Sequence, residues 1–218
     1  MSISVSKTCL AQTADSIPRV ILLGGLSLYG QGAERLHEEV VALAARWIDP
    51  DRRDGPLTAY ARETEAKTMD LLERALSSRE PPSSEVVQKR LLDAAPGDIA
   101  DLLPQLEPRA EELAAIATER LRKRGEREER DLRETLERQR GRVQQELDRY
   151  ERDAEQLMLG LNDEETRQLE SDMRSWRWRL DQFERDLARE PARVRDFYEV
   201  RARRVEPVGL VYLWPETN

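Results

Sequence analysis

Hydrophobic residues in the first fifty positions predict a strand, a turn and a helix. Residues 18–32, PRVILLGGLSLYGQG, form an apolar run that glycines interrupt and then close, as expected of a strand that ends in a turn. Residues 33–50 then place their apolar side chains on one helical face, and Pro50 would end that helix. The side chains on this face are Leu36, Val40, Leu43, Ala44 and Trp47.

Further helices are expected in the same part of the chain. Thr58 can cap a helix over residues 57–76. The segment PPSS then breaks the chain, and proline and glycine separate two shorter predicted helices at 83–95 and 97–103. Residues 18–104 are therefore predicted to form a strand plus a small helical block.

Two heptad-like repeats fill the proline-free span between Pro108 and Pro191. In the first, apolar side chains alternate steps of four and three: Val143, Leu147, Tyr150, Ala154, Leu157 and Leu161. The second contains Leu169, Met173, Trp176, Leu180, Phe183 and Leu187. Glycine and capping residues predict a turn near 160–163, whereas Gly125 interrupts the first arm and suggests a weak or hinged point. The pattern predicts an antiparallel coiled-coil hairpin over residues 105–204.

The chain closes on an apolar stretch, VGLVYLW, at residues 208–214. Its β-branched and aromatic side chains favour a strand, and Pro215 prevents continuation. Because the hairpin returns to its own base, this strand is expected to pair with residues 20–30 in a small sheet. An open edge could also extend the sheet of another protein. The residues of this candidate docking strand are Val208, Leu210, Tyr212 and Trp214.

These patterns together predict a mainly α protein. A flexible tail is expected at residues 1–17, and the strand with short helices at 18–104. The long antiparallel coiled-coil hairpin follows at 105–204, and the docking strand at 205–218. The only sheet in this scheme is the small one made by the two terminal apolar strands.

Composition supports long helices and limits the partners. Charged residues make up 37% of the 218 residues and aromatic residues only 5%, which is typical of helical or coiled-coil proteins. The net charge of −8 excludes nucleic-acid binding through bulk charge, so any DNA contact would be local. The single Cys9 excludes an internal disulfide. No apolar run is long enough to cross a membrane and no signal peptide is evident, so we expect a cytoplasmic protein without a membrane partner.

Motifs for catalysis or cofactor binding are weak. The loop GGLSLYGQG lacks the Lys and Ser or Thr of a phosphate loop, and a structural turn explains it. The segment LMLGLNDEET places acids after leucines as a magnesium-binding strand does, but a helix N-terminus explains the acids. His37 is the only histidine, so a multi-histidine metal site is impossible. We therefore predict no catalytic residue, no metal and no cofactor in this chain.

Three groups of residues are candidate contacts for DNA or a partner. Trp178 lies two residues beyond the seam residue Trp176 and should point outward. It is bracketed by Arg174, Arg177 and Arg179. Two basic clusters could contact phosphate: Arg120, Arg122, Lys123 and Arg124, and then Arg201, Arg203 and Arg204. The alternatives remain open: arginine stems or the N-terminal block could cover the tryptophan, and nearby acids could neutralise the clusters.

Four stretches add to one another: LSLYGQGAERLHEE, GPLTAYARETEAKTMDLLE, RQLESDMRSWRWRL and EPARVRDFYEVRARRVEPVGLVYLWP. Together they resemble the C-terminal region of bacterial Swi/Snf-like superfamily-two helicases, notably the large helicase of DISARM-type anti-phage defence systems. The resemblance covers residues 18–215. It implies a region appended to an ATP-driven motor on duplex DNA, but the phosphate loop, metal-binding motif and arginine-finger motif of the motor are missing.

The resemblance therefore implies a non-enzymatic accessory module of a DNA-translocating helicase. Such a module would dock on the ATPase core and contact duplex DNA or another defence-system subunit. ATP and magnesium are expected only in that core. The alternative from the residues alone is a self-associating coiled-coil scaffold that has no connection with a motor.

Overall fold

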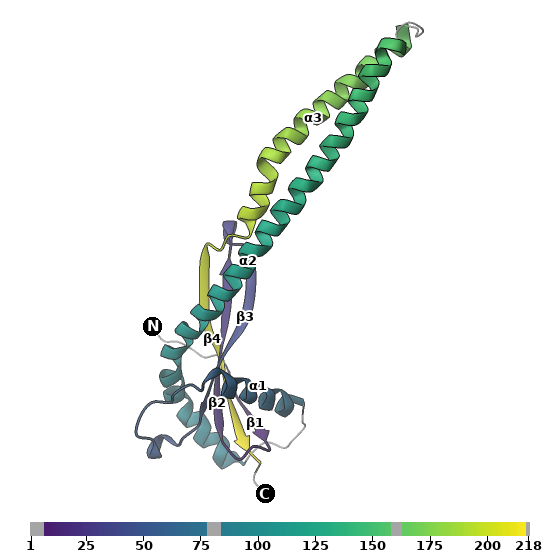
Figure 1. Cartoon of the computed structure of the whole chain (residues 1–218). Coiled ribbons are helices and arrows are strands. Elements are labelled where there is room, and N and C mark those ends of the chain that lie inside the picture. The colour runs from purple at the N-terminus through teal and green to yellow at the C-terminus, as the bar shows by residue number, and fades with distance from the viewer. Residues whose placement is uncertain (1–6, 78–83, 158–162, 217–218) are drawn as a thin grey trace. The chain divides into compact units, whose positions relative to one another are not determined.

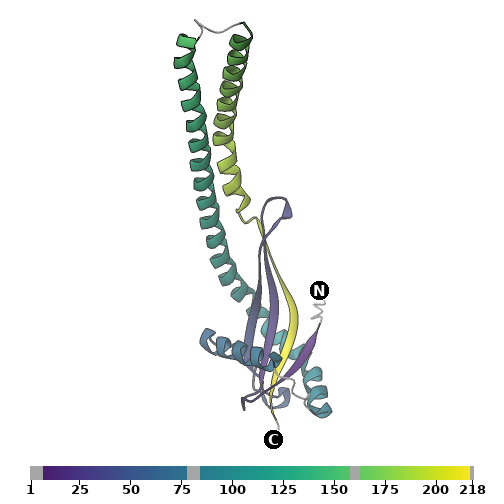
Figure 2. The same ribbon diagram turned by 90° about the vertical axis from the view of Figure 1, so that its right-hand side faces the viewer.

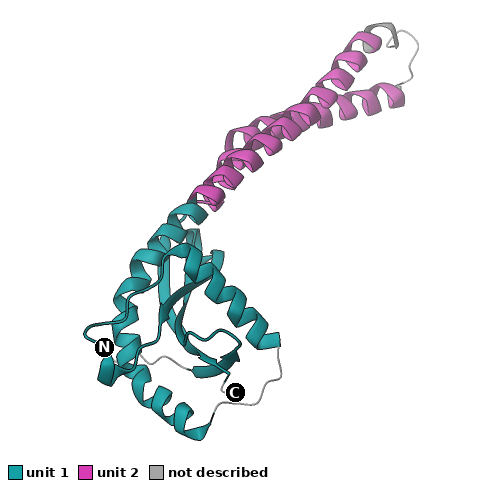
Figure 3. Ribbon diagram, turned by 60° about the horizontal axis from the view of Figure 1, so that its bottom comes forward, with its two compact units in different colours: residues 1–118, 200–218 teal, residues 119–199 magenta. Residues whose placement is uncertain are grey.

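The computed structural model of the chain describes residues 7–77, 84–157 and 163–216 (Figure 1). Its strands are β1 (Thr8–Thr13), β2 (Arg19–Tyr29), β3 (Arg35–Arg46) and β4 (Ala202–Pro215). Its α-helices are α1 (Arg62–Ser77), α2 (Glu85–Leu157) and α3 (Asp163–Phe197), and short 3-10 helices occupy Gln31–Ala33 and Pro50–Arg52. The chain divides into unit 1, residues 1–118 and 200–218, and unit 2, residues 119–199 (Figure 3).

Unit 1 is built on a four-stranded mixed sheet in the order β1-β4-β2-β3. Strand β4 lies between β1 and β2, parallel to the first and antiparallel to the second. Strands β2 and β3 form an antiparallel hairpin that extends well past α1 (Figure 2). The predicted mainly α fold with a small two-stranded sheet is therefore wrong, although the predicted pairing of the two terminal apolar stretches is present.

Strand β3 replaces the helix predicted over residues 33–50. Leu43 lies opposite Leu22 and Ala44 lies opposite Ile21, so neighbouring residues of β3 face opposite sides of the sheet. All four of these side chains are buried. A strand covered on both faces has a continuous apolar run, and helical spacing can be found in such a run by chance. Burial of both faces of this segment in the folded protein favours a strand over a helix.

Strand β1 lies inside the segment that was predicted to be a flexible tail. Thr8–Thr13 pair with residues 210–215 of β4, and Thr13 is buried. The backbone N–H of Leu210 also donates to the carbonyl of Lys7, at 3.0 Å. This strand contains Thr, Cys and Gln as well as apolar residues, so its sequence gave little hydrophobic signal.

Helices cover both faces of the sheet. On one face Ile21, Ala44 and Leu213 pack with Leu72 of α1. On the other face the Tyr212 hydroxyl meets Asp98 of α2, so adjacent residues of β4 contact different helices. Figure 3 shows the sheet flanked by α1 and by the first part of α2. The core of unit 1 is therefore two apolar layers separated by the sheet.

Helix α2 is continuous through the prolines that were predicted to break it. Pro96, Pro104 and Pro108 all lie inside the helix and are all exposed. The opposite face is a long buried row: Leu91, Ala95, Asp98, Leu102, Leu106, Ala110, Ala114 and Ala117. Carbonyl groups that lose a proline partner on the outer side can bond to water, while the buried row on the opposite side packs within unit 1. The two short helices predicted at 83–95 and 97–103 are one helix.

Unit 2 consists of the second part of α2 and of α3, which run in opposite directions. Glu151 pairs with Arg177, Arg140 with Glu184 and Glu129 with Arg195. Tyr150 packs edge-to-face on Trp176 with ring centroids 4.4 Å apart. The turn predicted near 160–163 falls on residues outside the described part of the chain, except for Asp163, where α3 begins.

The predicted coiled-coil seam is not formed as a continuous buried core. Leu147 and Leu180 are buried, but Tyr150 is 37% exposed. The other described seam side chains are only half-buried: Val143, Leu169, Met173, Trp176, Phe183 and Leu187. Tyr150 and Trp176 are seam residues that meet across the two helices, but the predicted coiled-coil hairpin is otherwise wrong. Two helices without a third neighbour leave both sides of their contact open to water.

Candidate functional site

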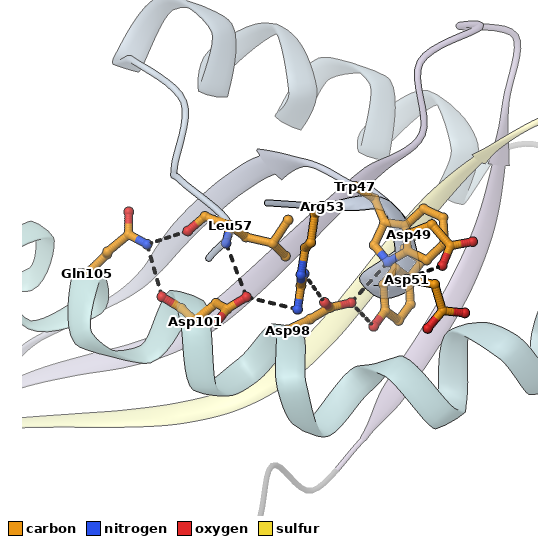
Figure 4. Close-up of polar contacts among 9 residues, drawn as sticks. Trp47, Asp49, Asp51, Arg53, Leu57, Asp98, Asp101 and Gln105 are labelled. Atoms are coloured by element: carbon orange, nitrogen blue, oxygen red, sulfur yellow. Dashed lines mark hydrogen bonds and ion pairs between the residues drawn. The ribbon is translucent and has the colours of Figure 1, made fainter. Parts of the chain in front are cut away.

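The most connected polar cluster of unit 1 is centred on Asp98, whose side chain is fully buried (Figure 4). Its Oδ2 atom accepts hydrogen bonds from Trp47 Nε1 at 3.0 Å and from the Tyr212 hydroxyl at 2.7 Å. Its Oδ1 atom accepts from Arg53 Nη1 at 2.8 Å. Burial and the bond to Asp98 raise the pKa of Tyr212 well above its ordinary value. Both carboxylate oxygens are therefore used inside the protein.

Neighbouring polar side chains of α2 continue this cluster along the same loop. Asp101 Oδ2 accepts from the Leu57 backbone N–H at 3.1 Å and pairs with Arg53 at 3.0 Å. Gln105 donates to the Leu57 carbonyl at 2.8 Å and accepts from the Ala59 N–H at 3.0 Å. These contacts bind residues 47–59 to α2 as a network, and they leave no polar group directed at a ligand.

A hollow of about 440 Å³ lies between residues 49–51 and the start of α2. Arg90 is one of the residues that line this hollow, and it pairs with Asp49 at 2.5 Å and with Asp51 at 3.3 Å. Among the described residues there is no group of three His, Cys, Asp or Glu side chains that could hold a metal ion. None of the described helices is long and apolar enough to cross a membrane.

The first predicted basic cluster lies on α2 in unit 2, and glutamates of the same helix neutralise most of it. Arg122 hydrogen-bonds to Glu119 and lowers the pKa of that carboxyl to about 2. Lys123 lies 3.4 Å from Glu119, and Arg124 pairs with Glu128 at 2.9 Å. Arg120 is exposed. This is the solvated, self-neutralised face that the sequence had left open as an alternative.

The second predicted cluster lies where the chain enters β4 in unit 1. Arg203 forms an ion pair with Glu107 of α2, and Arg204 forms one with Glu206. The Arg201 N–H donates to the Tyr29 carbonyl at 2.7 Å, which fixes the backbone at this point. Arg203 and Arg204 are therefore exposed but paired with carboxylates.

The second half of the predicted docking strand is paired on both of its edges. Leu210 and Tyr212 of β4 pair with β1 on one side and with β2 on the other, and their side chains are buried. Trp214 packs edge-to-face on Trp47 with ring centroids 5.2 Å apart. Val208 is 52% exposed and precedes the residues of β4 that pair with β1, which are Leu210–Pro215. Pairing within the chain therefore leaves no free edge for a partner strand over residues 210–213.

Trp178, another predicted contact residue, has open surroundings. It is 62% exposed, whereas Trp176 packs on Tyr150 of the other helix. Arg177 bridges to Glu151 of α2 at 2.7 Å and is therefore committed to the contact between the helices. Arg179 is exposed and lies about 100° around α3 from Trp178.

Trp178 lies in an exposed row that runs along α3, which we call the α3 stripe. Its members are Arg167, Ser171, Arg174, Trp178, Arg185 and Arg189, and all are exposed. At about 100° per residue they fall within about 40° of the direction of Trp178, and they extend over about 33 Å. A helix of this length therefore presents one straight row with four arginines and one tryptophan.

The arginines of the α3 stripe are poorly neutralised. Arg174 Nη1 lies 3.9 Å from Glu170, which is a long and exposed contact. Among the described residues, no ion pair or hydrogen bond engages the Arg167, Arg185 or Arg189 side chain. The contrast with Arg122 and Arg124 on α2 is clear, because those side chains lie against carboxylates at hydrogen-bonding distance.

Sequence reasoning found Arg174 and Trp178 but missed Arg167, Arg185 and Arg189. The signal was present in the spacing, because steps of seven and eleven residues return to the same side of a helix. Arg167, Arg174 and Arg185 are related by such steps. The prediction considered only the local cluster MRSWRWRLDQF, so it did not recognise this longer repeat.

No protein-family model, curated protein or solved structure matches the chain. The functional argument therefore rests on the exposure and charge of the α3 stripe.

Proposed function

We propose that the chain is a non-catalytic accessory module that contacts nucleic acid through the α3 stripe and works with a DNA-translocating helicase core. The observation that carries the proposal is the row of four exposed, poorly neutralised arginines centred on Trp178. Guanidinium groups bind phosphate oxygens well, and an exposed tryptophan adjacent to them is a recurrent feature of nucleic-acid sites.

Local charge can support such binding although the chain has a net charge of −8. Binding energy from phosphate contacts comes mainly from the release of counterions at the contacted phosphates. The acids of the chain that pair with their own arginines, such as Glu119 and Glu128, add little field at α3 at physiological salt, where charges are screened over about 8 Å.

The helicase core in the proposal comes from the resemblance of four stretches to the C-terminal region of Swi/Snf-like superfamily-two helicases. That resemblance places a motor, its ATP and its magnesium in another chain, and makes other defence-system subunits possible partners in the cytoplasm. Since both edges of β4 are paired over residues 210–213, we place docking on such a core at a different surface of unit 1.

Strand β3 offers such a surface along its outer edge. The Ala44 carbonyl accepts from the Tyr60 N–H at 2.7 Å on the side away from β2. By the alternation of an antiparallel ladder, the main-chain groups of Glu38, Val40 and Ala42 point the same way. These groups form no backbone hydrogen bond on that side with any described residue, and Val40 is 65% exposed. An added strand could therefore continue the sheet here.

The same edge favours the alternative function, a self-associating scaffold. Two copies could pair their β3 strands around Val40 and form a dimer without a motor. Analytical ultracentrifugation of the purified chain separates the two readings: a monomer at low micromolar concentration supports the accessory module. A stable dimer that Val40→Pro converts to monomer would instead establish the scaffold, because proline removes the donor at the centre of the pairing.

The test of nucleic-acid contact compares two charge-matched variants. Replacing Arg167, Arg174 and Arg185 with Gln removes three stripe charges. Replacing Arg122, Arg133 and Arg149 with Gln removes three charges that face acids on α2. Fluorescence anisotropy with a labelled oligonucleotide should show at least tenfold weaker binding for the stripe variant only, equivalent to about 1.4 kcal/mol. Equal loss in both variants would indicate only a general effect of net charge.

A further inference from the structure

We infer that the α3 stripe binds a single strand of nucleic acid, with Trp178 stacking on an unpaired base. The inference rests on the proposed function and adds the class of ligand. Three features of α3 lead to it: the exposed side chain of Trp178, the position of the arginines along one side of the helix, and the acids along the margins of that row.

Trp178 can contribute most to the binding of nucleic acid when a base is not stacked on its neighbours. Its side chain is 62% exposed, and within the described part of the chain no ring contact, cation–π contact or hydrogen bond involves it. The faces of duplex bases are covered by their neighbours, so a tryptophan on the outside of a duplex meets only sugars and phosphates. A base of a single strand can lie flat on the indole, and such stacking is sequence-tolerant.

The arginine row also matches one strand better than two. The stripe extends for about 33 Å along one side of α3. Over a similar distance, about 34 to 36 Å, each backbone of B-DNA makes one full turn around the duplex axis. Most duplex phosphates would therefore wind away from the row. A flexible single strand can follow it from Arg167 to Arg189.

Acids border the row and narrow the surface on which an anion can lie. Glu170 and Asp181 lie about 60° to 80° to one side of Trp178, and Asp186 lies about 80° to the other side. Glu170 and Asp181 are exposed, and Asp186 is half-buried. The second backbone of a duplex would lie over one of these margins and be repelled, whereas a single strand fits between them.

The experiment measures binding of the full chain to three labelled probes, each about 20 nucleotides long so that it exceeds the stripe. The probes are oligothymidylate, oligouridylate and a mixed-sequence duplex, and the first two distinguish DNA from RNA as the source of the single strand. Wild type is compared with Trp178→Leu, which removes stacking, and with Trp178→Tyr, which keeps an aromatic face. Circular dichroism checks that each variant is folded.

We expect wild type to bind at least one single strand about tenfold more tightly than the duplex, with Trp178→Leu losing most of that preference and Trp178→Tyr retaining it. Equal binding to all probes, or tighter duplex binding, together with no effect of Trp178→Leu would overturn the single-strand inference. The proposed function would survive that result if the arginine variant still lost affinity. Absence of binding to every probe would overturn both.

Discussion

At the scale of single residues, Asp98 holds unit 1 together more than any other polar side chain. It accepts hydrogen bonds from Trp47, Arg53 and Tyr212, which come from the end of β3, the following loop and the central strand β4. Each of these donors is buried or nearly buried, so loss of the carboxylate would leave them without a partner in the interior. The position of one carboxylate therefore fixes three segments on α2.

We predict that Asp98→Ala lowers the free energy of unfolding by about 3 to 5 kcal/mol, because it leaves two buried donors and a buried guanidinium edge unpaired. Urea denaturation followed by circular dichroism measures the change. Asp93→Ala, at an exposed site on the same helix, is the matched control and should change the free energy by less than about 0.5 kcal/mol. Similar losses for the two variants would contradict the role given to Asp98.

Tyr212 should give the fold an alkaline limit. Its pKa is raised in the folded state by burial and by Asp98, so the stability that depends on its protonated form is complete below the unfolded tyrosine pKa of about 10. As the pH rises above that value, the unfolded state loses the proton first and is favoured. Wild type should therefore lose up to about 1.4 kcal/mol per pH unit more than Tyr212→Phe above pH 10.

Urea midpoints of wild type and Tyr212→Phe, measured at closely spaced values between about pH 8 and pH 11, test this. Tyr60 and Tyr198 also have raised pKa values because of burial, but both variants contain them, so their effect cancels in the difference. Parallel pH profiles for the two proteins would show that Tyr212 ionises in the folded state as readily as in the unfolded chain.

At the scale of elements, Gly125 is a point of close packing in α2, at the position that its sequence context predicted to be weak or hinged. A Cβ at this position would lie 3.1 Å from the Tyr198 Cβ and 3.2 Å from the Arg195 carbonyl oxygen. The Tyr198 hydroxyl donates to Glu128 at 2.8 Å, and Arg124 lies over the Tyr198 ring at 5.1 Å. The glycine therefore lets the end of α3 approach α2 closely.

Two glycine substitutions in α2 should change the stability of the protein in opposite directions. Gly125→Ala should destabilise unit 2 by about 1 to 3 kcal/mol, because the new methyl group meets the Tyr198 Cβ and the Arg195 carbonyl oxygen, which cannot move without moving the backbone. Gly141→Ala should stabilise by about 0.8 to 1 kcal/mol, since nothing lies within 4 Å and alanine favours the helix. The melting temperatures of the two variants, measured by thermal denaturation, test both predictions. Stabilisation by both would mean that α3 does not approach Gly125.

Individual elements show how much of the fold could be predicted from the sequence. Helix α1 and the pairing of β2 with β4 were predictable, because their apolar patterns are local and unambiguous. Strand β3 was not, since a run such as VVALAA fits a covered strand as well as a helix. The prolines of α2 were given too much weight. The buried row from Leu91 to Ala117 has helical spacing throughout and was the better guide.

The polar network around Asp98 could not be predicted from the sequence, for a different reason. Asp98 lies in that buried row, at a position where the pattern alone would call for an apolar residue. A lone acid in an apolar row indicates a buried partner, but the partners come from residues 47, 53 and 212, and sequence spacing cannot identify contacts over such separations. Candidate contact residues were predictable in part, because Trp176 and Trp178 alternate sides in any helix.

At the scale of the whole molecule, an exposed tryptophan among poorly neutralised arginines distinguishes the α3 stripe. The chain has 36 basic and 44 acidic residues, and many arginines pair with an acid. On α2, Arg122 and Arg133 do so within one helical turn. Other exposed arginines of α2, such as Arg127 and Arg142, form no ion pair with a described residue, but α2 carries no tryptophan beside them.

The salt dependence of binding tests the central claim, that the α3 stripe contacts phosphates, most directly. The logarithm of the association constant for a labelled single strand is measured against the logarithm of salt concentration. Each lost phosphate contact should reduce the slope by about 0.7. The account predicts a slope smaller by about 2 for the variant with Gln at 167, 174 and 185, and an unchanged slope for the variant with Gln at 122, 133 and 149. Identical slopes for wild type and the stripe variant would contradict the claim.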